Sequence, residues 1–277
     1  MKKNDEILDV TSALVPPLLS ALDALQMASR FMHPPNIAAV VEVISDKQLA
    51  VRDGLHTFQS AEWPENLERF FVAVKESAEN ALEAFAFFDE AVKQSEPAMT
   101  AYRAMGLVTK ALESMYPVAS MLAPVSRFYL EDSSRSNDLL LKRLEDADTS
   151  KSDVGVMHAN NSDRERGGFS MYVPEYYQGE ETPLVVALHG GSGHGRNFLW
   201  SWLVAARSKN AILVAPTSLG GTWSLMDPES DIQHLKSLVS YVRKNWSIDS
   251  KKILLTGMSD GGTFTYVAGL EKNSAFT

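Results

Sequence analysis

The spacing of the apolar residues changes near residue 150, and this change limits the possible folds more than any other feature. From Leu18 to Leu144 apolar residues recur every three or four positions, as in amphipathic helices. The clearest helix lies between Trp63-Pro64 and Pro97, because proline cannot continue a helix interior. Its apolar positions are Leu67, Phe71, Val74, Ala78, Leu82, Phe85, Phe88 and Val92. We predict an acidic all-helical domain of about four or five helices over residues 1–150.

After residue 154, short apolar runs alternate with helical segments. Strands are predicted at 154–158, 169–173, 183–188, 211–215 and 252–256, with helices after each of the last three. Strands joined in this way form a mostly parallel sheet with helices on both faces. We therefore predict an α/β domain over residues 151–277. The polar stretch 145–153 lacks periodicity and is the expected linker.

The two predicted domains differ in charge. The net charge is −9, and residues 1–150 carry 14 Lys and Arg against 23 Asp and Glu, whereas the remaining residues carry 12 of each. An acidic first domain repels phosphate backbones and anionic lipid surfaces. We expect no nucleic-acid partner, and the sequence leaves the partner of the helical domain open.

Composition excludes several kinds of site. The chain has no cysteine, which removes disulfides, thiolate chemistry and zinc–thiolate centres. We find no apolar stretch of the ~18 residues that cross a bilayer, and acids interrupt the first ten residues, so we expect a cytoplasmic protein without a membrane span. Helix-spaced aromatic residues are assigned to the core and not to a ligand groove, namely Phe70, Phe71, Phe85, Phe87 and Phe88.

The sequence Gly257-Met258-Ser259-Asp260-Gly261 joins a predicted buried strand to a predicted helix. In so sharp a turn the residues on either side of the serine come close together, and Gly257 and Gly261 lack the Cβ atoms that would collide. The turn places the Ser259 hydroxyl at the carboxyl edge of the sheet and at a helix N-terminus. This arrangement predicts Ser259 as a nucleophile.

A second glycine-rich turn, His189 to Gly195, follows the strand 183–188 at the same edge of the sheet. Together, Leu188-His189-Gly190-Gly191 and Gly257 to Gly262 resemble the α/β-hydrolase superfamily, most nearly its carboxylesterase/phospholipase and dienelactone-hydrolase-like branch, over residues 154–277. The resemblance implies an oxyanion hole formed by the N–H groups of Asp260 and Gly191, with Ser192 as the alternative donor. It implies neither a metal nor an organic cofactor.

The resemblance also bears on the remaining polar residues. The triad histidine of this family follows the serine, so His189 is expected to be a scaffold residue and not the base. Ser192, His194, Trp223 and Met258 are the candidates for the pocket, although a core position for Trp223 and a solvent-facing one for His194 remain open. Asp231 is expected to cap a helix and not to act as the triad acid, and His158 and His234 receive no catalytic role.

The 18 residues after Ser259 contain no histidine. We expect the triad acid and base beyond Thr277, and the chain to be part of a longer enzyme. The leading hypothesis is a serine carboxylic-ester hydrolase that works through an acyl-enzyme on Ser259 and a small ester substrate. The alternatives are a non-catalytic protein whose helical domain binds a partner, with a pseudo-hydrolase scaffold, and a peptidase or thioesterase on the same fold.

Overall fold

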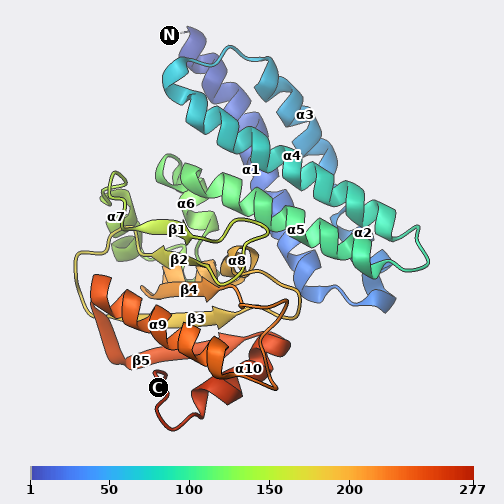
Figure 1. Ribbon diagram of the computed structural model, residues 1–277. Coiled ribbons are helices and arrows are strands. Elements are labelled where there is room, and N and C mark those ends of the chain that lie inside the picture. Colours follow the sequence, from blue (N-terminus) through green and yellow to red (C-terminus); the bar gives the residue numbers. More distant parts are fainter. Residues whose placement is uncertain (1) are drawn as a thin grey trace. The chain divides into compact units, whose positions relative to one another are not determined.

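The computed structural model describes residues 2–277. The chain divides into two compact units, Met1–Phe128 and Tyr129–Thr277. The first is helical and the second contains a sheet covered by helices (Figure 1). This confirms the predicted order of a helical region before an α/β region.

The helical unit contains six α-helices within its described residues. They are α1 (Lys2–Phe31), α2 (Ile37–Ile44), α3 (Lys47–Ser60), α4 (Glu68–Ala91), α5 (Ala98–Met115) and α6 (Ala123–Phe128). The predicted long helix matches α4 closely, whereas the expected number of helices was slightly too low. Phe70, Phe85 and Phe88 of α4 are buried, and the Phe71 ring stacks on Phe58 at 5.6 Å between centroids. These aromatic side chains therefore fill the core, as predicted, although Phe87 is half-buried.

Helix α1 corrects one prediction. Residues Asp5–Phe31 are long and apolar enough to cross a membrane by length and composition, which the search for an uninterrupted apolar stretch overlooked. Four leucines at helical spacing on this segment are fully buried within the unit, namely Leu14, Leu18, Leu22 and Leu25. A core helix of a bundle has the same length and composition as a membrane helix. The cytoplasmic location stays a prediction.

The sheet of the second unit has five strands in the order β1-β2-β4-β3-β5. The strands are β1 (Gly155–Ala159), β2 (Phe169–Val173), β3 (Thr182–Leu188), β4 (Ile212–Pro216) and β5 (Ile248–Gly257). The pairs β1–β2 and β2–β4 are antiparallel, and β3–β4 and β3–β5 are parallel. The sheet is thus mixed and not mostly parallel, because β2 runs antiparallel to both of its neighbours, β1 and β4.

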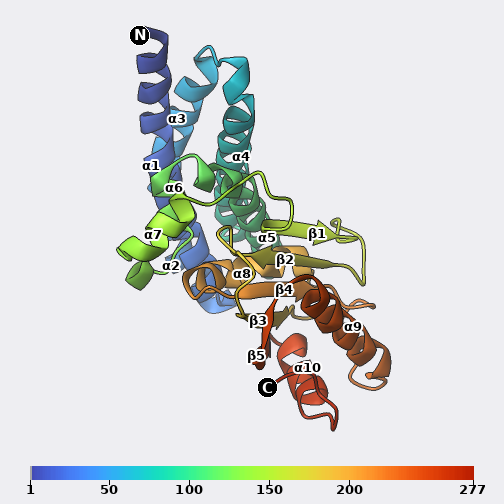
Figure 2. The same ribbon diagram turned by 90° about the vertical axis from the view of Figure 1, so that its left-hand side faces the viewer.

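Helices cover both faces of this sheet. Helix α8 (Gly195–Ser208) lies on one face, and α9 (Glu229–Asn245) and α10 (Asp260–Gly269) lie on the other (Figure 2). Alternate residues of β3, Leu184, Val186 and Leu188, share a buried core with Leu235 of α9 and Phe264 of α10. Because the three strands β3, β4 and β5 run in the same direction, their carboxyl ends meet at one edge of the sheet.

The boundary between the units differs from the predicted one at residue 150. Residues 129–150, which include α7 (Asp138–Glu145), belong to the sheet unit. Leu130 and Leu140 pack with Tyr176, and the Glu131 N–H donates to Ser208 Oγ at 2.8 Å. The sequence analysis grouped this segment with the preceding helices because its spacing is helical, but its apolar partners lie later in the chain.

Candidate active site

Ser259 lies in the turn between β5 and α10. Its backbone angles are φ 53° and ψ −120°, and a positive φ is a strained conformation for a residue with a Cβ. The turn is tied to the neighbouring strand, because the Met258 N–H donates to the Leu188 carbonyl at 3.1 Å. The Ser259 side chain makes no capping hydrogen bond to α10. The hydroxyl is therefore exposed at the carboxyl edge of the sheet on a constrained backbone.

The two glycines that flank the turn are sterically required. A Cβ on Gly257 would lie 2.5 Å from the carbonyl carbon of Gly261, and a Cβ on Gly261 would lie 2.4 Å from the carbonyl oxygen of His189. Both contacts are with backbone atoms, which cannot rotate away as a side chain can. The spacing of glycines around Ser259 thus has the structural reason that the sequence suggested.

The glycine-rich loop after β3 runs beside this turn. A Cβ on Gly190 would lie 3.4 Å from the Cβ of Ser259, and a Cβ on Gly191 would lie 2.7 Å from Oδ2 of Asp260. The Ser192 N–H donates to the Gly221 carbonyl at 3.1 Å, so the alternative oxyanion donor is already engaged. No acceptor for the Gly191 N–H is found among the loop hydrogen bonds of residues 2–277. Of the two candidate donors in this loop, Gly191 is the available one.

His189 is buried behind the loop, with 1% of its surface exposed. Its Nε2 accepts a hydrogen bond from the Ser218 N–H at 3.1 Å, so Nδ1 carries the proton and donates to the Gly190 carbonyl at 2.6 Å. Burial lowers the pKa of His189 to about 4. The imidazole is therefore neutral near pH 7, and it holds the peptide unit that carries the Gly191 N–H.

Two charged residues that the sequence analysis did not connect with the site hold the loops around it. Nη1 of Arg166 donates to the Gly193 carbonyl at 2.8 Å, and Nε and Nη2 of the same guanidinium donate to the Ser218 carbonyl and hydroxyl. Asp231 accepts from the N–H of Leu219 at 3.3 Å and from that of Ser224 at 2.9 Å. No local motif marks Arg166, because its partners lie 27 and 52 positions away in the sequence. The partners of Asp231 lie 7 and 12 positions away, in the loop before its helix.

Asp231 also differs from its predicted role as a helix cap. Helix α9 begins at Glu229, with Pro228 in the capping position, so Asp231 lies inside the first turn. Its carboxylate is 2% exposed and bonds to the loop after β4 and not to its own helix N-terminus.

The four predicted pocket residues lie in different environments. Trp223 is 1% exposed, stacks on Phe264 at 5.5 Å between centroids and donates from Nε1 to the His189 carbonyl at 2.9 Å, so it is a core residue. His194 is the N-cap residue of α8, and both of its ring nitrogens bond to backbone groups, at Arg196 and Glu165. Met258 and Ser192 are exposed beside the serine turn and in the glycine loop, respectively.

Ser259 Oγ has no hydrogen-bond partner within the described residues. The ring of His158 bonds to Ser170, and His189 and His194 bond to the groups named above. His234 lies on α9, where burial lowers its pKa and its Nε2 has no partner. Within residues 2–277, therefore, no general base lies at hydrogen-bonding distance of the serine. No group of three potential metal-ligating side chains occurs in the same residues.

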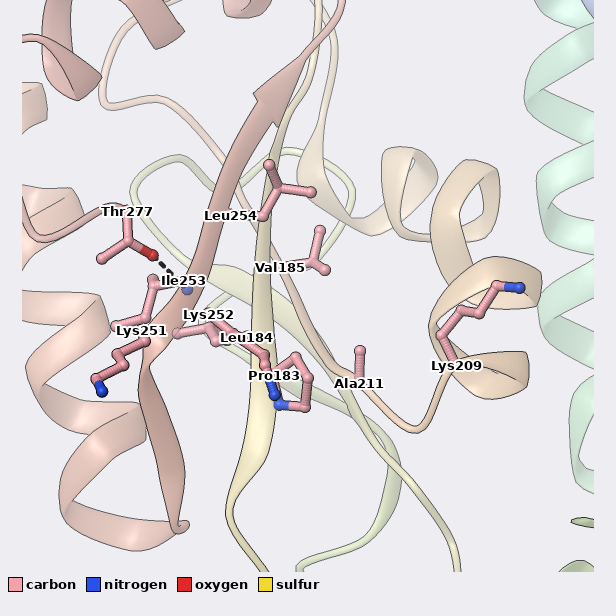
Figure 3. Close-up of a pocket in the computed structure, with 10 residues that line it drawn as sticks. All are labelled: Pro183, Leu184, Val185, Lys209, Ala211, Lys251, Lys252, Ile253, Leu254 and Thr277. Carbon is pink, nitrogen blue, oxygen red and sulfur yellow. Dashed lines mark hydrogen bonds between the residues drawn. The ribbon is translucent and has the colours of Figure 1, made fainter.

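The two described cavities lie away from the serine turn. One, of about 260 Å³, is lined by the first residues of β3 and by Lys251 to Leu254 of β5 (Figure 3). The other, of about 220 Å³, is lined by residues that include Phe169, His234 and Tyr241. Figure 3 also shows Thr277 beside β5, where its Oγ1 accepts from the Ile253 N–H at 3.1 Å. Neither cavity includes Ser259 among its lining residues.

Comparison with known proteins indicates a distant esterase relationship. No family model matches the chain. The chain is 31% identical over 117 residues to a bifunctional acetylxylan esterase/xylanase of Neocallimastix patriciarum, a match that covers 39% of this chain and 17% of that protein. The chain thus spans less than a fifth of the length of this relative. A thermostable esterase of known structure aligns with a TM-score of 0.34 and 19% identity over 44% of this chain and 38% of that chain.

Proposed function

We propose that this chain contributes the nucleophile and the oxyanion-binding loop of a serine esterase that hydrolyses carboxylic esters. The observation that carries the proposal is the conformation of Ser259, with φ 53° and ψ −120° between β5 and α10. Backbone strain of this kind is kept where the surrounding structure enforces it, and it is frequent at catalytic residues. The sequence match to a bifunctional acetylxylan esterase/xylanase, over 17% of that protein, supports an ester substrate.

In the proposed reaction Ser259 Oγ attacks the ester carbonyl carbon and transfers its proton to a general base. The carbonyl oxygen becomes an oxyanion, which the N–H groups of Gly191 and Asp260 bind. The bond to the alcohol then breaks, the alcohol takes the proton from the base, and water hydrolyses the acyl-enzyme in the same way. Each N–H donor stabilises the transition state by about 3–4 kcal/mol. A rigid glycine loop keeps the Gly191 N–H in position to supply this stabilisation.

The surroundings of Ser259 and the sequence match bear on the acyl group of the substrate. The open edge beside Ser259 offers the exposed side chain of Met258, and Ser259 lines neither of the two described cavities. Small acyl groups require little enclosure, and the related protein is named for acetyl ester cleavage. We therefore propose short-chain esters, acetyl esters first, as the substrates, ahead of the phospholipids that the family resemblance also allows.

A specific observation favours one rival. No described histidine bonds to Ser259. The second candidate is therefore a non-catalytic protein with a pseudo-hydrolase scaffold and a partner-binding helical unit.

An ester-hydrolysis assay distinguishes the serine esterase from this non-catalytic protein. The purified wild-type protein should hydrolyse p-nitrophenyl acetate, and Ser259→Ala should lower that rate by ~10⁴-fold or more. Hydrolysis that does not depend on Ser259, or none at all, favours the rival.

The same assay distinguishes the ester specificities. We expect p-nitrophenyl acetate to be hydrolysed faster than p-nitrophenyl decanoate or phosphatidylcholine. A peptide or thioester substrate with a higher kcat/KM than any ester would assign the serine to the peptidase or thioesterase alternative.

A further inference from the structure

Three consecutive residues of the loop after β4 contact the two segments that carry the proposed oxyanion donors. Gly221 accepts at its carbonyl from the Ser192 N–H at 3.1 Å, and Trp223 donates from Nε1 to the His189 carbonyl at 2.9 Å. Between them, Thr222 Oγ1 donates to Oδ2 of Asp260 at 2.8 Å. Gly221 and Trp223 therefore hold the glycine loop, and Thr222 connects the loop after β4 with the serine turn.

The Asp260 carboxylate lies against the glycine loop. A Cβ on Gly191 would stand 2.7 Å from Oδ2 and 3.4 Å from the carboxyl carbon of Asp260, so the carboxylate fills the space that a side chain at position 191 would occupy. A carboxylate is a strong acceptor for a backbone N–H. If the side chain of Asp260 rotated toward the free Gly191 N–H, its carboxylate would accept the hydrogen bond that the oxyanion needs. Its negative charge would also repel the oxyanion.

We propose that Thr222 is a positioning residue of the esterase site, because its hydroxyl holds the Asp260 carboxylate away from the Gly191 N–H and fixes the serine turn against the glycine loop. This inference rests on the proposed function. Thr222 acts through Asp260 and contacts no reacting atom. Its own position is fixed, because the buried Asp231 binds the N–H groups of Leu219 and Ser224 on either side of it.

The test compares Thr222→Val, which keeps the shape and loses the donor, with Thr222→Ser, which keeps the donor. In an active preparation of the protein that contains this chain, Thr222→Val should lower kcat for p-nitrophenyl acetate by about tenfold to hundredfold, with KM changed by less than about twofold. Thr222→Ser should stay within about threefold of the wild-type kcat. A residue that only supported the fold would not separate kcat from KM in this way.

A second pair of variants tests the route through Asp260. Asp260→Asn keeps an oxygen that accepts from Thr222 and removes the negative charge. In the Asp260→Asn background, Thr222→Val should therefore cost less than about threefold in kcat, and the difference between the two backgrounds measures the coupling. Equal losses in the two backgrounds would overturn the inference, and so would equal losses for Thr222→Val and Thr222→Ser.

Failure of the inference and failure of the proposed function give different results. If Ser259→Ala abolishes hydrolysis while Thr222→Val stays within about threefold of wild type, the role of Thr222 is wrong and the esterase assignment stands. If hydrolysis survives Ser259→Ala, the proposed function is wrong, and the role of Thr222 fails with it.

Discussion

The serine turn and the glycine loop after β3 lie side by side, but they are held in different ways. In the serine turn, backbone packs on backbone: Gly257 meets Gly261, Gly261 meets His189, and Met258 pairs with Leu188. In the glycine loop, side chains from other segments bind the carbonyls, among them Arg166 and Trp223. The first arrangement needs particular residues within one short segment, whereas the second needs particular residues spread over the chain.

The comparison implies different responses to substitution and pH. The serine turn is held by backbone packing, so a Cβ added at Gly257 or Gly261 should destabilise it. The glycine loop is held by a neutral imidazole and a guanidinium, and the adjoining loop after β4 is held by the Asp231 carboxylate. These loops should respond to the protonation and charge of those groups. The three predictions that follow test this contrast, beginning with the largest expected effect.

The largest loss of stability is expected from adding one methyl group to the serine turn. Gly257→Ala and Gly261→Ala each place a Cβ within 2.6 Å of backbone atoms, so each should lower the free energy of unfolding of the sheet unit by about 3 kcal/mol or more. Thermal unfolding followed by circular dichroism measures the loss. Gly269→Ala is the matched control, because no atom lies within 4 Å of its added Cβ and the residue ends the same helix. A loss of under about 1 kcal/mol at both turn positions would show that the turn has room to relax.

The second prediction concerns pH and the glycine loop. Burial holds the folded-state pKa of His189 at about 4, below its ordinary value of 6.5, so the unfolded state binds the proton first as pH falls. The stability contributed by neutral His189 is complete above pH 6.5 and is lost as the pH falls toward 4, a change of about 3 kcal/mol. Urea unfolding of wild type and His189→Gln at several pH values should show a steeper decline for the wild type. Parallel curves would mean that burial does not hold the imidazole neutral in the folded state.

The smallest of the three effects is expected at Asp231. Asp231→Asn replaces one of two accepting oxygens with an amide that faces an N–H, so it should lower the free energy of unfolding by about 2 kcal/mol. Glu229→Gln is the control, since Glu229 lies on the same turn of α9 but is exposed and bonds to Gln233. We expect the control to change stability by less than about 1 kcal/mol. Chemical denaturation measures the free energy of unfolding of both variants. Similar decreases in the two variants would contradict the role of Asp231 in holding the loop after β4.

The same contrast explains what the sequence could predict. Ser259 and its glycines were recognisable because the steric requirement lies within five consecutive residues and the strand and helix on either side have clear patterns. Arg166 was missed because its two partners, Gly193 and Ser218, are 27 and 52 positions away. A lone arginine in a turn-rich segment has no local feature that indicates such contacts.

The sheet order shows a similar limit. The strand bounds were predicted to within a few residues, except for β5, which begins four residues earlier than expected. The antiparallel placement of β2 between β1 and β4 was not predicted. An apolar run shows that a strand is buried but not which neighbours it pairs with. The segment 129–150 was assigned to the wrong unit for the same reason, since its helical spacing does not reveal that Leu140 packs against Tyr176.

The central claim is that Ser259 is the nucleophile, and covalent labelling tests it most directly. An active preparation of the protein that contains this chain is treated with a fluorophosphonate, digested and mapped by mass spectrometry, with Ser259→Ala as the control. The account predicts one phosphonyl group per chain on the peptide that contains Ser259, loss of ester hydrolysis in step with labelling, and no label in the variant. A label on another residue, or full inactivation with Ser259 unmodified, would contradict it.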